Sequence, residues 1–219
     1  MIDKPDIDYN AELARKCIHL TSLSIPIIYY FIERDLALEL LVPVTFAFLT
    51  VDLLRYYHKP TAELFYKIFR FMLRKHEQDE RKKRLNGATN VLIAATLCVI
   101  IFPKLIVLTA FPILIVSDTF AALIGRKFGR RKFMRKSVEG STAFFLFALF
   151  VIALTPKVEY SMTEYLIGII AAVVGTVVEA SSWMFDDNLT IPLSIGVVMW
   201  GLYFVFYPTI NLFAFSVGH

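Results

Sequence analysis

The sequence predicts an all-α membrane protein, a single integral-membrane domain over residues 1–219 with about seven transmembrane helices and one helix at the membrane surface. Three observations support this prediction. The chain is 57% hydrophobic with a mean hydropathy of +0.62, whereas soluble domains lie nearer to half apolar. The apolar residues form blocks close to the ~20 residues that cross the hydrocarbon core. The basic residues gather between these blocks.

Seven apolar blocks are expected to span the membrane, and the fifth is short. They are Ala14–Ile32, Leu36–Leu54, Ala88–Phe102, Leu105–Ile124, Ser141–Leu154, Tyr165–Met184 and Ile191–Tyr207. The acidic N-terminal segment has no cleavage pattern, so no signal peptide is expected. Cys17 and Cys98 lie at different predicted depths, so no disulfide is expected either.

The connections hold the 23 Lys and Arg residues very unequally. One side has three in the N-terminal segment, ten in residues 55–87 and seven in residues 126–136, whereas the other side has only Arg34, Lys104 and Lys157. Because cytoplasmic loops carry the excess of basic residues, the N-terminus is expected in the cytoplasm and the C-terminus outside. An even number of spans would destroy this partition.

The long connection at 55–87 contains the predicted surface helix. It starts near Pro60-Thr61 and combines an apolar stripe with basic residues, a pattern typical of a helix that lies in the interface and binds anionic lipid. The stripe is Leu64, Phe65, Ile68, Phe69 and Met72, and the basic residues are Lys67, Arg70, Arg74 and Lys75, followed by the basic run 81–84.

Three predicted spans run from outside to inside, and each carries one acid: Asp52, Asp118 and Glu179. At 1.5 Å per residue each acid lies roughly 20–24 Å into a ~30 Å core. The first span opens at a similar depth with Arg15 and Lys16. Ionisable residues in spans are costly in lipid and are often functional, so this layer predicts a polar pocket near the cytoplasmic face.

Each of these residues also has a simpler interpretation. Asp52 lies three residues before Arg55, and a local ion pair is favoured there over a catalytic role. Glu179 pairing with a base, or Arg15 and Lys16 anchoring a helix end among lipid headgroups, remains open. His19 is expected to be a hydrogen-bonding residue, because no second His or Cys lies at metal-ligand spacing. Asp118 is harder to explain simply, because its span has no base before Arg126.

The segment that follows Asp118 combines two glycines with seven basic residues. Gly125 and Gly129 would let a ligand approach the backbone where the helix ends, and Ser137 or Ser141 would cap the next helix. The common nucleotide-binding motifs are absent. From the residues alone, a topology-setting basic loop is the safer interpretation. The basic residues are Arg126, Lys127, Arg130, Arg131, Lys132, Arg135 and Lys136.

This segment resembles a family signature. Ser117-Asp118-Thr119, Gly125-Arg-Lys-Phe-Gly129 and Lys136-Ser137-Val-Glu139-Gly140-Ser141 are similar to the motif of the CTP-dependent lipid kinases, which include diacylglycerol, dolichol and phytol kinases. Three more segments, over most of the chain, resemble the same family: Glu12-Leu-Ala-Arg15-Lys16-Cys-Ile-His19, Asn86-Gly87-Ala-Thr, and Glu179-Ala with Asp186-Asp187-Asn188-Leu-Thr190-Ile-Pro192.

The resemblance implies transfer of the γ-phosphoryl group of CTP to a membrane lipid alcohol, with Mg²⁺ or another divalent cation and an active site facing the cytoplasm. The diacylglycerol branch is the most similar, which implies phosphatidate as product, and phytol or a polyprenol is the alternative acceptor. The implied catalytic residues are Asp118, Arg15 and Lys16, with Asp118 as base or metal ligand. The implied nucleotide-binding residues are Gly125, Arg126, Lys127, Gly129, Lys136, Ser137, Glu139, Gly140 and Asn86, and the implied metal ligands are Asp118, Glu179 and Asp187.

The implied location is a prokaryotic inner membrane or an ER-type membrane, with CTP, lipid alcohol and the bilayer as partners and no nucleic acid. Two rivals remain. A CTP:phosphatidate cytidylyltransferase also uses CTP and buried acids in a membrane bundle. A transporter belongs to a different class, but its acids usually lie at the midplane, on broken helices.

Overall fold

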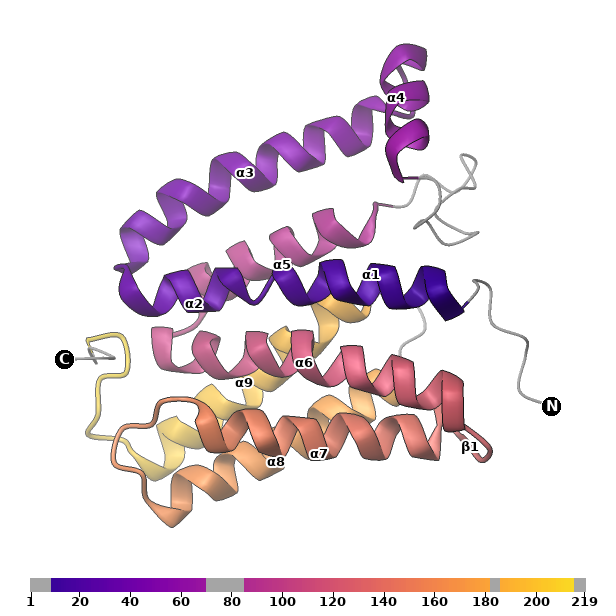
Figure 1. Ribbon diagram of the computed structural model, residues 1–219. Helices are drawn as coiled ribbons and strands as arrows, with labels where there is room; N and C mark the ends of the chain where they lie inside the picture. The colour runs from indigo at the N-terminus through magenta and orange to yellow at the C-terminus, as the bar shows by residue number, and fades with distance from the viewer. Residues whose placement is uncertain (1–8, 70–84, 182–185, 215–219) are drawn as a thin grey trace.

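The structure, a computed structural model, describes residues 9–69, 85–181 and 186–214, and this part of the chain is almost entirely helical (Figure 1). A two-stranded hairpin, β1–β2, interrupts the helices. The elements are α1 Tyr9–Thr21, α2 Ser24–Phe31, α3 Arg34–Leu54, α4 Lys59–Phe69, α5 Gly87–Ile101, α6 Lys104–Phe128, β1 Lys132–Phe133, β2 Lys136–Ser137, α7 Val138–Leu154, α8 Met162–Ser181 and α9 Asp187–Phe206.

The prediction of an all-α protein with membrane-spanning helices is confirmed in its main point. Among the described residues, α3, α6, α8 and α9 are long and apolar enough to cross a membrane, and α5 and α7 are shorter apolar helices. Each coincides with one of the predicted blocks. Large apolar side chains also remain exposed on the outside of the bundle, such as Phe46 on α3 and Phe204 on α9. Such a surface suits a hydrocarbon environment.

The first predicted span differs from expectation, because residues 14–32 form two helices rather than one. The chain passes from α1 to α2 through tight turns, with the Ser22 and Leu23 amides bonded to His19 and Leu20 three residues back. The physical reason is Pro26, which has no N–H to offer to Ser22 and whose ring crowds that carbonyl. The Ser22 carbonyl instead accepts the Ile25 amide at 3.0 Å.

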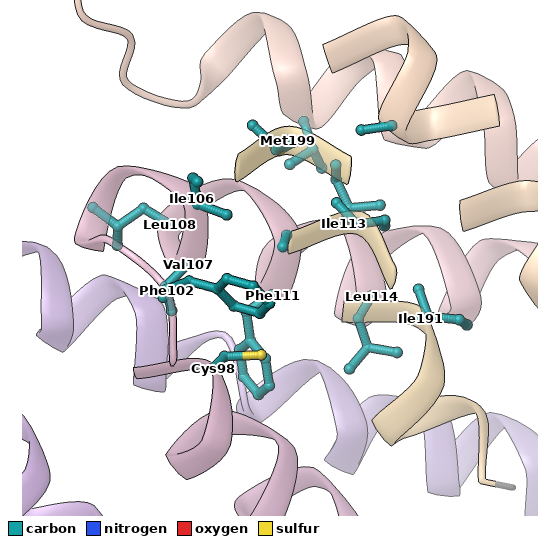
Figure 2. Packing of buried hydrophobic residues seen from close by; sticks show 14 of the residues in the cluster. Cys98, Phe102, Ile106, Val107, Leu108, Phe111, Ile113, Leu114, Ile191 and Met199 are labelled. Carbon is teal, nitrogen blue, oxygen red and sulfur yellow. The ribbon is translucent and has the colours of Figure 1, made fainter. Parts of the chain in front are cut away.

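Helix α6 is the central helix of the bundle. It contacts α7 and α9 along much of its length, and α1 and α2 on another face. Figure 2 shows the packing where α5 and α6 meet, with Cys98, Phe102 and Phe111 in contact and all three almost completely buried. A helix surrounded in this way is shielded from lipid, so polar residues on α6 can be kept away from the hydrocarbon.

The connections alternate between the two ends of the bundle (Figure 1). One end, here called the hairpin end, carries the start of α1, α4, the β1–β2 hairpin and the start of α9. The opposite end carries the α2–α3, α5–α6 and α7–α8 connections and the end of α9. The basic loop after α6 lies at the hairpin end.

The basic loop itself is folded, which the sequence did not indicate. β1 pairs antiparallel with β2, with Lys132 opposite Ser137 and Phe133 opposite Lys136. Met134 in the turn has a φ of 49°, a left-handed conformation that tightens the reversal. The Arg135 amide donates to the Ala180 carbonyl at 3.1 Å. This bond attaches the hairpin to the end of α8.

Candidate functional site

The first part of the candidate site is an ion pair between α1 and α6. Lys16 Nζ contacts Asp118 Oδ2, and both residues are buried. His19 Nε2 lies 3.8 Å from the same carboxylate oxygen. Asp118, for which the sequence offered no partner within its own span, therefore receives its base from a helix 102 residues earlier in the chain.

The second part is a lysine between two carboxylates, on β2, α8 and α9. Lys136 Nζ lies 3.1 Å from Glu179 Oε1 and 3.0 Å from Asp187 Oδ2. Burial alone would lower the pKa of the Lys136 ammonium, but Asp187 and Glu179, helped by Asp118, hold this pKa above its usual value. The two parts of the site are neighbours, because a Cβ on Gly125 of α6 would lie 3.1 Å from the hydroxyl oxygen of Ser137, the residue after Lys136.

The third part is centred on Glu12 of α1. Its carboxylate lies 2.6 Å from Arg15 Nη2 and 3.2 Å from Arg126 Nη2, and the residue is only 1% exposed. Glu12 thus joins α1 to the end of α6 through two arginines that the sequence analysis named. Glu12 was not among the predicted site residues. Its position three residues before Arg15, on one face of a helix, was the available signal.

These contacts join α1 to α6, and β2 to α8 and α9. The two neighbouring groups of side chains are together called the charged cluster. It contains four acids and four bases: Glu12, Asp118, Glu179 and Asp187 with Arg15, Lys16, Arg126 and Lys136. Desolvating so many charges is expensive unless each is compensated, and here acids and bases are balanced. One oxygen of this set, Asp187 Oδ1, is buried and accepts no hydrogen bond from any residue that the structure describes.

The two glycines that are expected to admit a ligand also pack closely against protein atoms. A Cβ on Gly125 would lie 3.1 Å from Ser137 Oγ and 3.3 Å from the Gly140 Cα, and a Cβ on Gly129 would lie 2.9 Å from the same hydroxyl oxygen. The glycines therefore allow α6 to approach the start of α7 closely. Ser137 is the cap of α7, as one of the two predicted choices, since its hydroxyl accepts the Gly140 amide at 3.1 Å.

The remaining predicted nucleotide-binding residues lie at the edge of the charged cluster. Lys127 is exposed, with its ammonium 5.4 Å from the centre of the Phe128 ring. Glu139 faces the hairpin, with both carboxylate oxygens 3.4 Å from the Arg131 amide nitrogen. Asn86 caps α5, because its side-chain oxygen accepts the Thr89 amide at 2.9 Å. The contacts of these three side chains serve local structure.

Asp52 belongs to a separate cluster, and the expected local pair is confirmed. Arg55 Nε lies 2.9 Å from Asp52 Oδ1, and both side chains are fully buried. The second Asp52 oxygen accepts the Asn86 amide at 2.7 Å. The basic residues 70, 74, 75 and 81–84 of the expected surface segment, with Met72, lie outside the described residues.

The chain is similar to a protein of a bacterium. It is 33% identical over 189 residues to the uncharacterized protein RP860 of Rickettsia prowazekii (strain Madrid E), an alignment that covers 85% of this chain and 92% of that protein. The chain belongs to the family of RP860. No family model matches it, and no solved structure does. The RP860 family therefore gives the charged cluster no function, and any function must be argued from its chemistry.

Proposed function

We propose that this protein is a CTP-dependent lipid kinase that transfers the γ-phosphoryl group of CTP to the hydroxyl of a membrane lipid. One observation carries the proposal: four cationic and four acidic side chains from distant segments converge at one end of a membrane-type bundle. Phosphoryl transfer needs little covalent chemistry from the protein and depends on positioning and charge neutralisation. The charged cluster offers both at a place that a lipid headgroup reaches.

The proposed membrane arrangement has seven spans, with α1 and α2 together as the first and the hairpin end in the cytoplasm. The alternation of the connections between the two ends supports this count. In the sequence-based partition, 20 of the 23 Lys and Arg residues fall on the same side of the membrane as the basic loop 126–136. The positive-inside rule then orients the bundle, and the charged cluster lies on the side where CTP is available.

The balance of charges in the charged cluster bears on how a nucleotide would bind. A neutral set of four acids and four bases has no excess positive charge for a triphosphate, so a divalent cation is expected to accompany it. Carboxylate oxygens suit Mg²⁺, which usually takes one or two of them and completes its shell with phosphate and water. Within the described part of the chain, Asp187 Oδ1 is buried without a hydrogen-bond donor, and Asp187 and Glu179 both pair with Lys136. These two acids therefore fit such a cation, which would neutralise phosphate charge when bound.

The bases then have distinct roles. Lys136 and Arg126, from the hairpin and the end of α6, are proposed to hold phosphate oxygens, and Arg15 to hold the transferring group. Lys16 fixes Asp118 from α1. We assign Asp118 to the reacting end of the site, where it either receives the proton of the lipid hydroxyl or contributes to cation binding.

Diacylglycerol is the proposed acceptor, with phosphatidate as product. The test uses purified protein in lipid nanodiscs with γ-labelled CTP, Mg²⁺ and a panel of diacylglycerol, phytol and polyprenols. We expect label in the lipid and release of CDP, loss of turnover when ATP replaces CTP, and loss of turnover in Asp118→Ala. Formation of CDP-lipid and pyrophosphate would instead identify a cytidylyltransferase, and wild-type turnover in Asp118→Ala would refute the assigned site.

A further inference from the structure

A second buried charge pair lies at the hairpin end, outside the charged cluster. Asp52 and Arg55 at the end of α3 form it, with Arg55 Nε 2.9 Å from Asp52 Oδ1 and neither side chain exposed. The guanidinium carbon of Arg55 lies 4.7 Å from the centre of the Tyr56 ring and 4.5 Å from that of Phe65. Phe65 belongs to α4 and is itself buried. The short helix α4 is thus seated on the ion pair through a cation–π contact.

The same ion pair holds the start of α5. Asp52 Oδ2 accepts the amide of Asn86 at 2.7 Å, and Asn86 is the residue that caps α5. A carboxylate that bonds an arginine with one oxygen and a buried amide with the other is fixed in direction. The start of α5 therefore cannot move without breaking one of these bonds.

The start of α5 borders the charged cluster. A Cβ built on Gly87 would lie 4.0 Å from Arg15 Nη1 and 3.9 Å from Asn188 Nδ2. Arg15 is one of the bases of the charged cluster, and Asn188 follows Asp187. Contacts therefore run from α4 through Phe65, Arg55 and Asp52 to Asn86, and the next residue, Gly87, lies beside Arg15 and Asn188.

We propose that Asp52 and Arg55 are positioning residues, which fix the start of α5 so that Arg15 and the start of α9 keep the geometry that the nucleotide requires. This inference rests on the proposed kinase function for its kinetic consequence only. Helix α4 covers one face of Arg55. The geometry of the nucleotide site therefore depends on the position that α4 takes at the membrane surface. Small misplacements matter in such sites, since a shift of about 1 Å far from the chemistry can cost 100-fold in rate.

The molecule provides a matched control at the other end of the same two helices. Arg34, at the start of α3, donates from Nε to the Val99 carbonyl at 3.0 Å and also bonds the Ile100 carbonyl, near the end of α5. Its guanidinium carbon lies 5.2 Å from the centre of the Phe213 ring. Arg34 thus joins α3 to α5 with similar chemistry but far from the charged cluster.

The test compares Asp52→Asn/Arg55→Met with Arg34→Met in nanodiscs. The double variant removes both charges together, because removing one would leave the other buried and unpaired. Hydrogen exchange is measured over residues 12–18 and 187–190, and KM is measured separately for CTP and for the lipid. In the double variant we expect faster exchange in both segments and a KM for CTP raised about 10- to 100-fold, with the lipid KM unchanged. Arg34→Met should change neither.

Three results would overturn the inference. Unchanged exchange over residues 12–18 in a folded double variant would show that α5 does not hold α1. An equal effect of Arg34→Met on exchange and on the KM for CTP would show that the effect comes from general packing between α3 and α5 and not from positioning by Asp52 and Arg55. Faster exchange with an unchanged KM for CTP would show that the position of the start of α5 does not affect nucleotide binding. If the wild type transfers no phosphoryl group from CTP, the proposed function fails, and the exchange measurement alone decides this inference.

Discussion

The two ends of the bundle use buried charge in different ways. At the hairpin end, side chains from distant segments bond to one another, as Lys136 does with Glu179 and Asp187. At the opposite end, charged side chains bond mainly to the backbone. Lys104 donates to the Tyr30 and Ile32 carbonyls, both at 3.0 Å, and Glu164 accepts the Val158 and Glu159 amides at 2.7 and 2.9 Å.

We interpret this difference as one between charge that completes the fold and charge that serves the proposed function. Backbone groups at helix ends and in loops lack partners, so a charge that bonds to them completes the fold. Buried ion pairs between side chains gain less for stability, because desolvation offsets their attraction. A protein that keeps several of them at one end of a membrane bundle has another use for them. The comparison therefore predicts that similar substitutions have different effects at the two ends. Those at the hairpin end should mainly lower turnover, and those at the opposite end should mainly lower stability.

The largest difference is expected between Asp118→Asn and Glu164→Gln. Asp118→Asn should lower lipid phosphorylation about 1,000-fold, in line with the loss of a group that acts on the reacting atoms. Glu164→Gln should keep turnover within a few-fold but cost about 1–3 kcal/mol of stability, because it weakens the acceptor for buried amides and the Tyr203 hydroxyl. Turnover assays and thermal unfolding in detergent measure the two effects. Equal losses of turnover would remove the distinction between the ends.

A smaller loss is expected for Lys136→Met. Without the ammonium, Glu179 and Asp187 repel each other and any phosphate, so kcat/KM for CTP should fall about 100-fold. Lys132→Met is the control, since Lys132 is an exposed base on the paired strand of the same hairpin. Its removal should leave kcat/KM for CTP nearly unchanged at physiological salt, where exposed charges are screened. A similar loss in both variants would mean that the hairpin acts only through its net charge.

The sequence predicts those features that depend on near neighbours. The helices follow from apolar blocks, the Asp52–Arg55 pair from its i, i+3 spacing, and the Ser137 cap from a serine before an apolar run. Asp118 and Glu179 of the charged cluster were also identified, because an acid in a span is costly, whereas Glu12 was not. The features that the sequence did not predict are mostly contacts between residues that lie far apart in the chain. Nothing in the sequence indicates that Lys16 bonds Asp118, because helix packing decides it.

Other unpredicted features have local causes, which the pattern of apolar blocks does not reveal. The first predicted span is divided into two helices because Pro26 removes a backbone hydrogen bond. The length of the apolar block alone does not indicate this break. The basic loop reads as a charge block, so its hairpin was not expected. The close packing of Gly125 and Gly129 against Ser137 was not expected, and their role in admitting a ligand stays a prediction. A glycine pattern alone does not distinguish close packing from ligand binding.

The packing role of Gly125 leads to a prediction of intermediate size. Gly125→Ala places a methyl group 3.1 Å from Ser137 Oγ and 3.3 Å from the Gly140 backbone, so α6 and α7 must separate slightly. We expect turnover to fall about 10-fold, since the bases on both sides of this contact shift together. Gly201→Ala on α9 is the control, because a Cβ there meets no atom within 4 Å. A similar loss of turnover in Gly201→Ala would show that the effect comes from replacing a helical glycine with alanine and not from the contact with Ser137.

The smallest effect concerns the dependence of stability on pH, and its sign should differ between the two ends. The pKa of Lys136 is raised in the folded protein because its carboxylates outweigh burial. Its contribution is therefore fully present below the unfolded pKa of about 10.4 and is lost as pH rises through the folded value. Burial lowers the pKa of Lys157 in spite of Glu164. The folded protein then releases this proton first, so the Lys157 contribution to stability rises with pH below about 10.4.

Unfolding of the wild type, Lys136→Met and Lys157→Met between about pH 7 and pH 11 measures both contributions. The stability difference between wild type and Lys136→Met should stay level up to about pH 10.4 and then decrease, and the difference for Lys157→Met should increase on approach to that pH. Slopes of the same sign would mean that Lys136 is not held by its two acids as an ion pair. Opposite slopes would show in solution that charge at the hairpin end is bound by charge, and charge at the opposite end mainly by the backbone.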